Sequence, residues 1–231
     1  AAVTSGLRRG ERSAADEGRS IRAYTILCAM RTADRSVEIV ELTDRARTID
    51  DKVVGFDLAG AETGFPPSLH ADALRIARER HLAITLHASE PPDLELIGDA
   101  LAHGAHRIGH GVRLRADMRI VDGEVVDLGP LAAYVLDHQV HLEMAPTCHV
   151  QVAAVPDLPS HPIGPMLRAG FNVGVNTDNR LMSNVMPSSE MALVRSTFGL
   201  DDDEARRLTV NAIRSGFAPF AERRRVLASV Q

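Results

Sequence analysis

The chain has 231 residues, 45% hydrophobic and 25% charged, which is enough to bury a sizeable core and too apolar for an intrinsically disordered protein. A net charge of −5 and a pI near 6.1 argue against nucleic-acid or acidic-membrane partners, because phosphate groups require clustered Lys and Arg. The distant Cys28 and Cys148, the lack of a long apolar run and a start unlike a signal peptide predict a cytoplasmic protein that is not inserted in a membrane.

Short apolar runs rich in strand-forming residues alternate with longer segments of helical period along the whole chain. This alternation is typical of βα units and predicts a parallel sheet flanked by helices. Periodicity alone leaves an α/β barrel and a doubly wound sheet open. The predicted strands are 21–30, 53–58, 82–87, 107–110, 140–144 and 171–176, and the predicted helices include 69–80, 93–103, 129–139, 161–169 and 201–216.

A chemically active side chain lies at or just after the end of five of these strands. In a (β/α)8 barrel the carboxyl ends of all strands meet on one face, where the active site is assembled. Charged residues often flank strands for purely structural reasons, but five such positions in succession favour the TIM-type barrel. The five residues are Asp57, His87, His110, Glu143 and Asp178.

Several short motifs occur at these strand ends in a fixed order. They are DLAG from Asp57, HASE from His87, RIGHG from Arg107, EMAP from Glu143, the HP pair at His161, NTDN from Asn176 and NAIRSGFAPF from Asn211. Together they resemble the motifs of zinc-dependent adenosine deaminases, a family of the amidohydrolase superfamily. The resemblance covers nearly the whole chain and implies hydrolytic deamination of adenosine or deoxyadenosine to inosine and ammonia, with a small purine nucleoside as the partner.

The resemblance also implies an architecture. Residues 1–231 would form one barrel domain holding about six of the eight βα units, with the first two strands, roughly 100 residues, missing. In the family the first strand ends in a His-X-His pair that supplies two zinc ligands. No His-X-His occurs in this sequence.

A Zn²⁺ cofactor is implied, because bound zinc lowers the pKa of its water to about 7 and so supplies hydroxide at neutral pH. Carried over from the family, His87 and Asp178 are metal ligands, and Asp178 also helps to move the proton of the water. Glu90 is the general acid that protonates purine N1. His110 orients the hydroxide and stabilises the developing charge.

Two further positions are implied to bind the substrate. The backbone N–H of Gly60 would donate to purine N3, and Asn179 would donate to N7 where the family has aspartate. A structural role alone stays open for each site residue. His87 could be a core histidine, Asp178 a turn former, and Gly60 a residue needed only for its positive φ.

Three departures from the family pattern bear on the expected site. Ser89 replaces the glycine of the HAGE motif, and we expect an extended strand conformation to tolerate it. Cys148 and His149 replace a Ser-Asn pair, which we expect to alter substrate fit, with a new metal site as a weaker alternative. Arg180 stands where many members have proline.

Alternative functions stay open alongside the deaminase. The missing ligand pair favours a catalytically silent relative that binds a nucleoside or a protein. An aminohydrolase acting on another 6-aminopurine, or a different zinc chemistry on the same barrel, is also compatible with the motifs. A homo-oligomer is neither required nor excluded.

Overall fold

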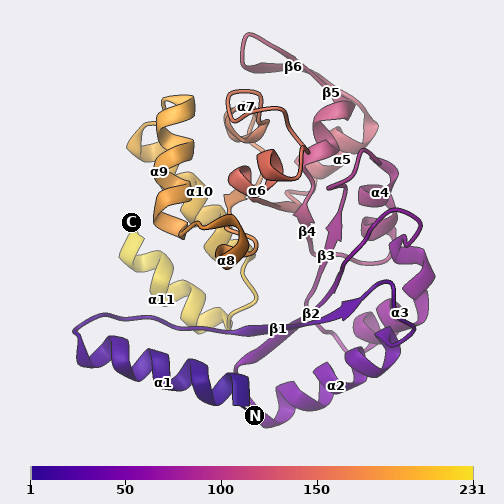
Figure 1. The fold of residues 1–231 in the computed structure, drawn as a ribbon, viewed down its shortest axis with the longest axis vertical. Coiled ribbons are helices and arrows are strands. Elements are labelled where there is room, and N and C mark those ends of the chain that lie inside the picture. The colour runs from indigo at the N-terminus through magenta and orange to yellow at the C-terminus, as the bar shows by residue number, and fades with distance from the viewer. Residues whose placement is uncertain (1, 231) are drawn as a thin grey trace.

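A curved parallel sheet forms the centre of the protein in the computed structural model, which describes residues 2–230 (Figure 1). Within these residues the central sheet has six strands in the order β1-β2-β3-β4-β7-β8, and every neighbouring pair is parallel. The strands are β1 (Thr25–Met30), β2 (Val53–Ala59), β3 (Ile84–Ala88), β4 (Arg107–His110), β7 (His141–Met144) and β8 (Val173–Val175). The predicted α/β fold with six parallel strands is confirmed.

Helices follow the strands along the chain and cover the outside of the sheet. In Figure 1, α2, α3, α4 and α5 form an arc beyond the strands, and α9, α10 and α11 lie on the other side. The α-helices are α1 (Ala2–Asp16), α2 (Ser36–Ile49), α3 (Ala71–Glu79), α4 (Glu95–Ala102), α5 (Pro130–Asp137), α6 (Pro146–Gln151), α7 (Ile163–Arg168), α8 (Arg180–Ser183), α9 (Pro187–Phe198), α10 (Asp202–Ser215) and α11 (Phe220–Val230), and 3-10 turns span Pro67–His70 and Val112–Asp117.

The core lies between the sheet and this layer of helices. Phe56, Leu58, Ile84, Leu86 and Ile108 on the central strands are each fully buried. Parallel strands covered on both faces read as continuous apolar runs, which is why these segments do not alternate between polar and apolar residues. The core therefore fixes the strands, and their carboxyl ends are left to carry polar side chains.

The sheet does not close on itself within the described part of the chain. There β1 pairs with β2 and β8 pairs with β7, and neither pairs with another strand of the central sheet. A closed eight-stranded barrel has no such edges. The arrangement is that of a partial barrel.

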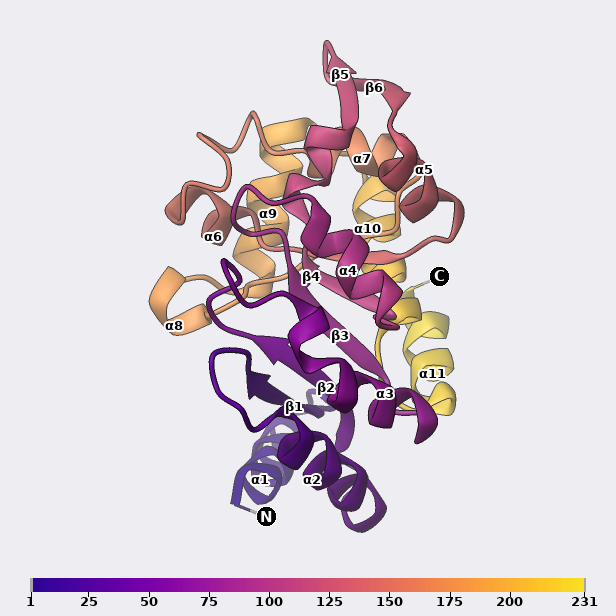
Figure 2. The ribbon, with the colours of Figure 1, turned by 90° about the vertical axis from the view of Figure 1, so that its right-hand side faces the viewer.

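A two-stranded hairpin projects at one end of the molecule, opposite α1 and α2 (Figure 2). Its antiparallel strands are β5 (Met118–Val121) and β6 (Glu124–Leu128), and neither was predicted. Across residues 2–230, none of the helices has the length and apolar character that crossing a membrane demands.

Candidate active site

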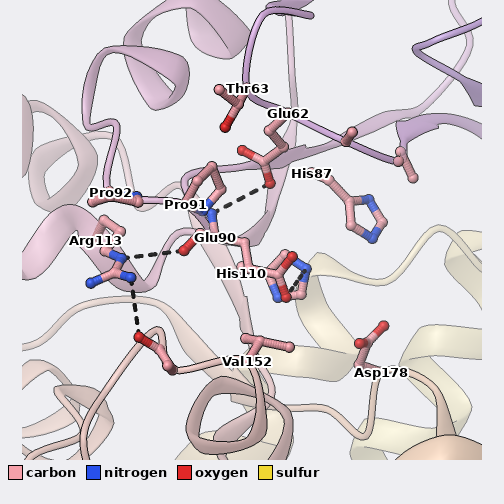
Figure 3. Close-up of a pocket in the computed structure, with 14 residues that line it drawn as sticks. Glu62, Thr63, His87, Glu90, Pro91, Pro92, His110, Arg113, Val152 and Asp178 are labelled. Atoms are coloured by element: carbon pink, nitrogen blue, oxygen red, sulfur yellow. Dashed lines mark hydrogen bonds and ion pairs between the residues drawn. The ribbon is translucent and has the colours of Figure 1, made fainter.

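A cavity of about 740 Å³ opens at the carboxyl ends of the strands (Figure 3). The segments after β2, β3, β4, β7 and β8 supply its walls, as expected for a site on a barrel. The cavity brings together five of the six residues predicted for the site, namely Gly60, His87, Glu90, His110 and Asp178.

His87 lies at the end of β3, with its ring directed into the cavity (Figure 3). Its Nδ1 is 3.1 Å from Oδ1 of the buried Asp57, while Nε2 forms no hydrogen bond within residues 2–230. Burial disfavours the charged ring, but the hydrogen bond and negative charge of Asp57 outweigh it and raise the pKa of His87 to about 9. A carboxylate behind one ring nitrogen is the usual partner of a metal-ligating histidine, and a metal ion at Nε2 would displace the proton that this pKa places there.

His110 ends β4 beside His87, with the two ring centroids 5.1 Å apart. Its Nδ1 is 3.0 Å from Nε2 of His149, and its own Nε2 lies 3.8 Å from Oε1 of Glu90. Burial, followed by the positive charge of His87, lowers the pKa of His110 to about 4. The ring is therefore neutral at pH 7.

Glu90 stands in the loop after β3, where its carboxylate is partly buried. Burial and then the negative charge of Asp178 raise the pKa of Glu90. A raised pKa keeps a carboxyl group protonated closer to neutral pH, which suits a general acid.

The backbone around Glu90 is held from two sides. The carboxylate of Glu62 accepts hydrogen bonds from the N–H of Ser89 at 2.6 Å and from the N–H of Glu90 at 3.4 Å. Nε of Arg113 donates to the carbonyl oxygen of Glu90 at 3.2 Å, as Figure 3 shows. These contacts fix the peptide that carries the proposed acid.

Asp178 follows β8 and faces the cavity opposite His87 (Figure 3). Its Oδ2 accepts a hydrogen bond from Sγ of Cys148 at 3.0 Å, and the same thiol lies 3.9 Å from Oε1 of Glu90. Burial, together with these carboxylates, raises the pKa of Cys148 well above its ordinary value, so the sulfur is a neutral donor. Cys148 therefore belongs to the site, as its place in the motif suggested.

Three non-glycine residues of the site region adopt left-handed backbone conformations, Ser89 at φ 69°, His110 at φ 63° and Asp178 at φ 49°. Such conformations cost about 1–3 kcal/mol each and cluster at functional sites. The expectation that Ser89 is extended was wrong. β3 ends at Ala88, and the chain turns through Ser89 to bring Glu90 into the cavity.

Gly60 and Asn179 differ in their fit to the predicted substrate roles. Gly60 lines the cavity at φ 102°, and a Cβ added there would come within 2.8 Å of Cε of Met30. Asn179 is not among the cavity-lining residues of the described chain, and its Oδ1 accepts the N–H of Met182 at 3.3 Å as the N-cap of α8.

Several residues around the site have no role that the sequence alone assigned. Asp57 was left open between structure and function, although a carboxylate on an apolar strand is a signal in itself. Glu62 follows the DLAG motif, and its role depends on its contact with the loop after β3, which the sequence alone does not show. Glu143 was noted only as a strand-end residue, and its carboxylate is bound by Arg107 at 2.6 Å and Thr85 at 2.8 Å and is not among the cavity-lining residues.

The donors available to a metal ion are few in this part of the chain. Among residues 2–230, no group of three or more His, Cys, Asp or Glu side chains is arranged to hold an ion. His87 and Asp178, the two predicted ligands, both line the cavity. A catalytic zinc ion needs three protein ligands and an open position.

Comparisons with known proteins agree with this geometry. The family model described as "Adenosine deaminase" matches residues 1–231. Adenosine deaminase 1 of Streptomyces coelicolor is 44% identical over 96% of this chain, and so is an adenosine deaminase of a Mycobacterium species, strain KMS. The chain spans 56% and 61% of the lengths of these two relatives.

Solved structures give the same result for the fold. An adenine deaminase from Arthrobacter aurescens superimposes with a TM-score of 0.79 at 27% identity, over 94% of this chain and 63% of that protein. A zinc-bound amidohydrolase from Burkholderia ambifaria gives a TM-score of 0.80 at 22% identity, over 99% of this chain and 60% of that protein. The chain belongs to the adenosine deaminase family.

Proposed function

We propose that the protein catalyses the hydrolytic deamination of adenosine or deoxyadenosine to inosine and ammonia. The observation that carries the proposal is the convergence of His87, Glu90, His110 and Asp178 on one cavity at the ends of parallel strands. Curated relatives named adenosine deaminase support it. Because the chain spans less than two thirds of those relatives, the proposal concerns the whole protein that contains it. Its unpaired cysteines suit a reducing compartment such as the cytoplasm.

The proposed cofactor is Zn²⁺, held by Nε2 of His87 and the carboxylate of Asp178 together with ligands from outside this chain segment. When bound, zinc supplies a hydroxide at neutral pH. The free Nε2 of His87, with Asp57 behind the ring, supports the first ligand. The Cys148 thiol donates to Oδ2 of Asp178 and leaves Oδ1 without a hydrogen-bond donor among residues 2–230.

The remaining roles follow from placement and charge. Glu90 delivers a proton to purine N1 as the amino-bearing carbon is attacked, which its raised pKa favours. His110, neutral and beside Glu90, orients the attacking oxygen. Asp178 assists the transfer of the water proton.

Two contacts are proposed for recognition of the purine. The N–H of Gly60 would donate to N3 at a wall where the backbone φ of 102° disfavours any side chain. Asn179 would donate to N7 through Nδ2, the part of its amide that the α8 cap does not use. This second contact requires Asn179 to turn towards the cavity when substrate binds.

Replacing Glu90 with Gln tests the proposed mechanism. The amide keeps the shape of the side chain but has no acidic proton, so we expect turnover of adenosine to fall by at least about 100-fold while zinc content is unchanged. The matched control is Glu95→Gln on the exposed start of α4, which should leave the rate unaltered. Equal rates for the Glu90 variant and the unaltered protein would remove Glu90 from the mechanism.

A second candidate function is nucleoside binding without turnover, which the absence of a three-ligand cluster within residues 2–230 favours. Calorimetric titration with adenosine, followed by an absorbance assay on adenosine, deoxyadenosine and adenine, separates the two. Saturable binding of a purine nucleoside with no loss of the amino group from any of the three would favour the silent relative.

A further inference from the structure

Three buried histidines form a continuous chain that leads away from the cavity. Nδ1 of His110 is 3.0 Å from Nε2 of His149, and Nδ1 of His149 is 2.8 Å from Nε2 of His161. The exposed fractions of the three residues are 5%, 0% and 1%, so they lie away from bulk solvent. Only the inner end, His110, lines the cavity. We call His110, His149 and His161 the histidine chain.

The far end of the histidine chain meets a group whose hydrogen-bonding role cannot change. The backbone N–H of Ile163, at the start of α7, donates to Nδ1 of His161 at 3.1 Å. A backbone N–H can only donate, so Nδ1 of His161 carries no proton. A neutral imidazole has one proton, and in His161 it must therefore sit on Nε2.

The tautomer of His161 determines the tautomers of the other two rings of the histidine chain. Nε2–H of His161 donates to Nδ1 of His149, which places the proton of His149 on its Nε2. That N–H in turn donates to Nδ1 of His110. The proton of His110 is thus on Nε2, the nitrogen that lies 3.8 Å from the Glu90 carboxylate.

Each ring of the histidine chain accepts a hydrogen bond at Nδ1, so each carries a single proton, on Nε2, and is neutral. Burial lowers the pKa of His161 to about 3 and, together with His161 and His110, lowers that of His149 well below its ordinary value. The opposite set of tautomers would place the proton of His161 on Nδ1, directly against the N–H of Ile163. That arrangement loses a hydrogen bond at a buried position, where an unpaired donor is costly.

We propose that His149 and His161 are positioning residues that hold His110 as an Nε2–H donor facing the cavity, so that His110 donates a hydrogen bond to the reacting oxygen and does not act as a base. This deepens the proposed function and rests on it for the identity of the reacting oxygen. To act as a base, His110 would need an unprotonated Nε2. The backbone N–H of Ile163 disfavours that tautomer through its effect on His161 and His149. His149 stands where the family pattern has a small amide, so the chain of three rings follows from this sequence.

The first test reads the protons directly. In the protein labelled with ¹⁵N at its histidine rings, NMR distinguishes a protonated from a bare ring nitrogen, and no turnover is needed. We expect His110 to show a protonated Nε2 and a bare Nδ1 at pH 7. A protonated Nδ1 on His110 would overturn the proposal.

The second test interrupts the histidine chain at its middle residue, His149. His149→Ala removes the donor to His110, so His110 should become a mixture of tautomers. His149→Gln can place an amide N–H near the position of Nε2, and it should keep the bare Nδ1 of His110. The matched control is His141→Gln, because His141 is a buried histidine bonded to Asn172 outside the histidine chain. A folded His149→Ala protein with an unchanged His110 spectrum would also overturn the proposal.

Kinetics then separates positioning from mere stability. We expect kcat of His149→Ala to fall roughly 10-fold with little change in KM, the usual size of effect for a residue that supports a site residue, and His149→Gln to recover most of the loss. An equal loss in the Ala, Gln and His141 variants would reduce the role to folding and contradict the proposal. If the unaltered protein deaminates no purine, the proposed function fails, and the NMR result still decides the tautomer of His110.

Discussion

Ser89 combines two unfavourable features in one residue. Its backbone is left-handed at φ 69°, and its hydroxyl is buried without a hydrogen-bond partner in the described structure. Glycine adopts positive φ without strain and has no side-chain oxygen to desolvate. The glycine of the HAGE motif is therefore the residue that the backbone geometry prefers, and Ser89 occupies its place at a cost in stability.

Ser89→Gly should accordingly stabilise the protein by about 1 kcal/mol, a net value after the greater flexibility of glycine in the unfolded chain is counted. Urea denaturation measures the change. The matched control is Ala88→Gly, one residue earlier at the end of β3, which should destabilise because glycine weakens a strand that needs no special backbone conformation. A loss of stability in Ser89→Gly would contradict the strain assigned to Ser89.

The sequence could identify residue types at the site but not all of their partners. His87, Glu90, His110 and Asp178 stand in motifs, so their meeting at one cavity was predictable. The contact of His149 with His110 joins residues 39 positions apart and depends on how α6 packs beside β4. No local pattern encodes such a contact, and the sequence led us to interpret His149 as a change in substrate fit, with a new metal site as the alternative.

At the scale of elements, the β2 loop holds the β3 loop in place through Glu62, a carboxylate that is 6% exposed. Burial raises the pKa of Glu62 from 4.5, despite the hydrogen bonds and positive charge that oppose it. The folded protein therefore binds a proton at Glu62 more tightly than the unfolded chain does. The contribution of Glu62 to stability is greatest below pH 4.5 and falls as the pH rises through the raised value.

Glu62→Gln removes this titration but keeps an oxygen that can accept the N–H of Ser89. The stability of the variant relative to the unaltered protein should increase between pH 4 and pH 7. Urea denaturation of both proteins at a series of pH values provides the measurement. A difference in stability that stays constant across that range would show that Glu62 has the same pKa in the folded and unfolded states.

The presence of the central strands was easier to predict than the residues at which they begin and end, or than the additional hairpin strands. The predicted bounds of β4 match the structure at 107–110, where left-handed backbone at His110 and Gly111 ends the strand. β1 starts at Thr25, four residues later than predicted, because 21–24 are not paired with β2. The hairpin that was not predicted does have a signal in the sequence, the Asp122-Gly123 pair. Both residues take positive φ, as a two-residue hairpin turn requires.

At the scale of the molecule, the partial barrel limits how tightly this chain alone can bind a zinc ion. Only two ligands are proposed here, His87 and Asp178, and the described residues contain no cluster of three. The chain of 231 residues should therefore retain well under one zinc ion after gel filtration, and His87→Ala should lower that content little further. Atomic absorption measures it. One tightly bound zinc per chain would show that the ligand assignment is wrong.

The architecture was predictable further than the site, for a physical reason. A parallel sheet is predicted by apolar runs that alternate with segments of helical period, and both are local patterns in the sequence. The polar residues at the strand ends then favoured the barrel. The contacts that tune the site, such as that of Cys148 with Asp178, join loops brought together only by the curvature of the sheet.

The histidine chain also bears on how this protein can change over generations. His149 and His161 are joined by one hydrogen bond at 2.8 Å inside the core, so a substitution at either position leaves the other with an unmet partner. The cost of losing both should be smaller than the sum of the two single losses, which is epistasis of the kind that a double-mutant cycle measures. Random mutation would then reach a different pair of residues at these positions more readily by paired change than by one step at a time.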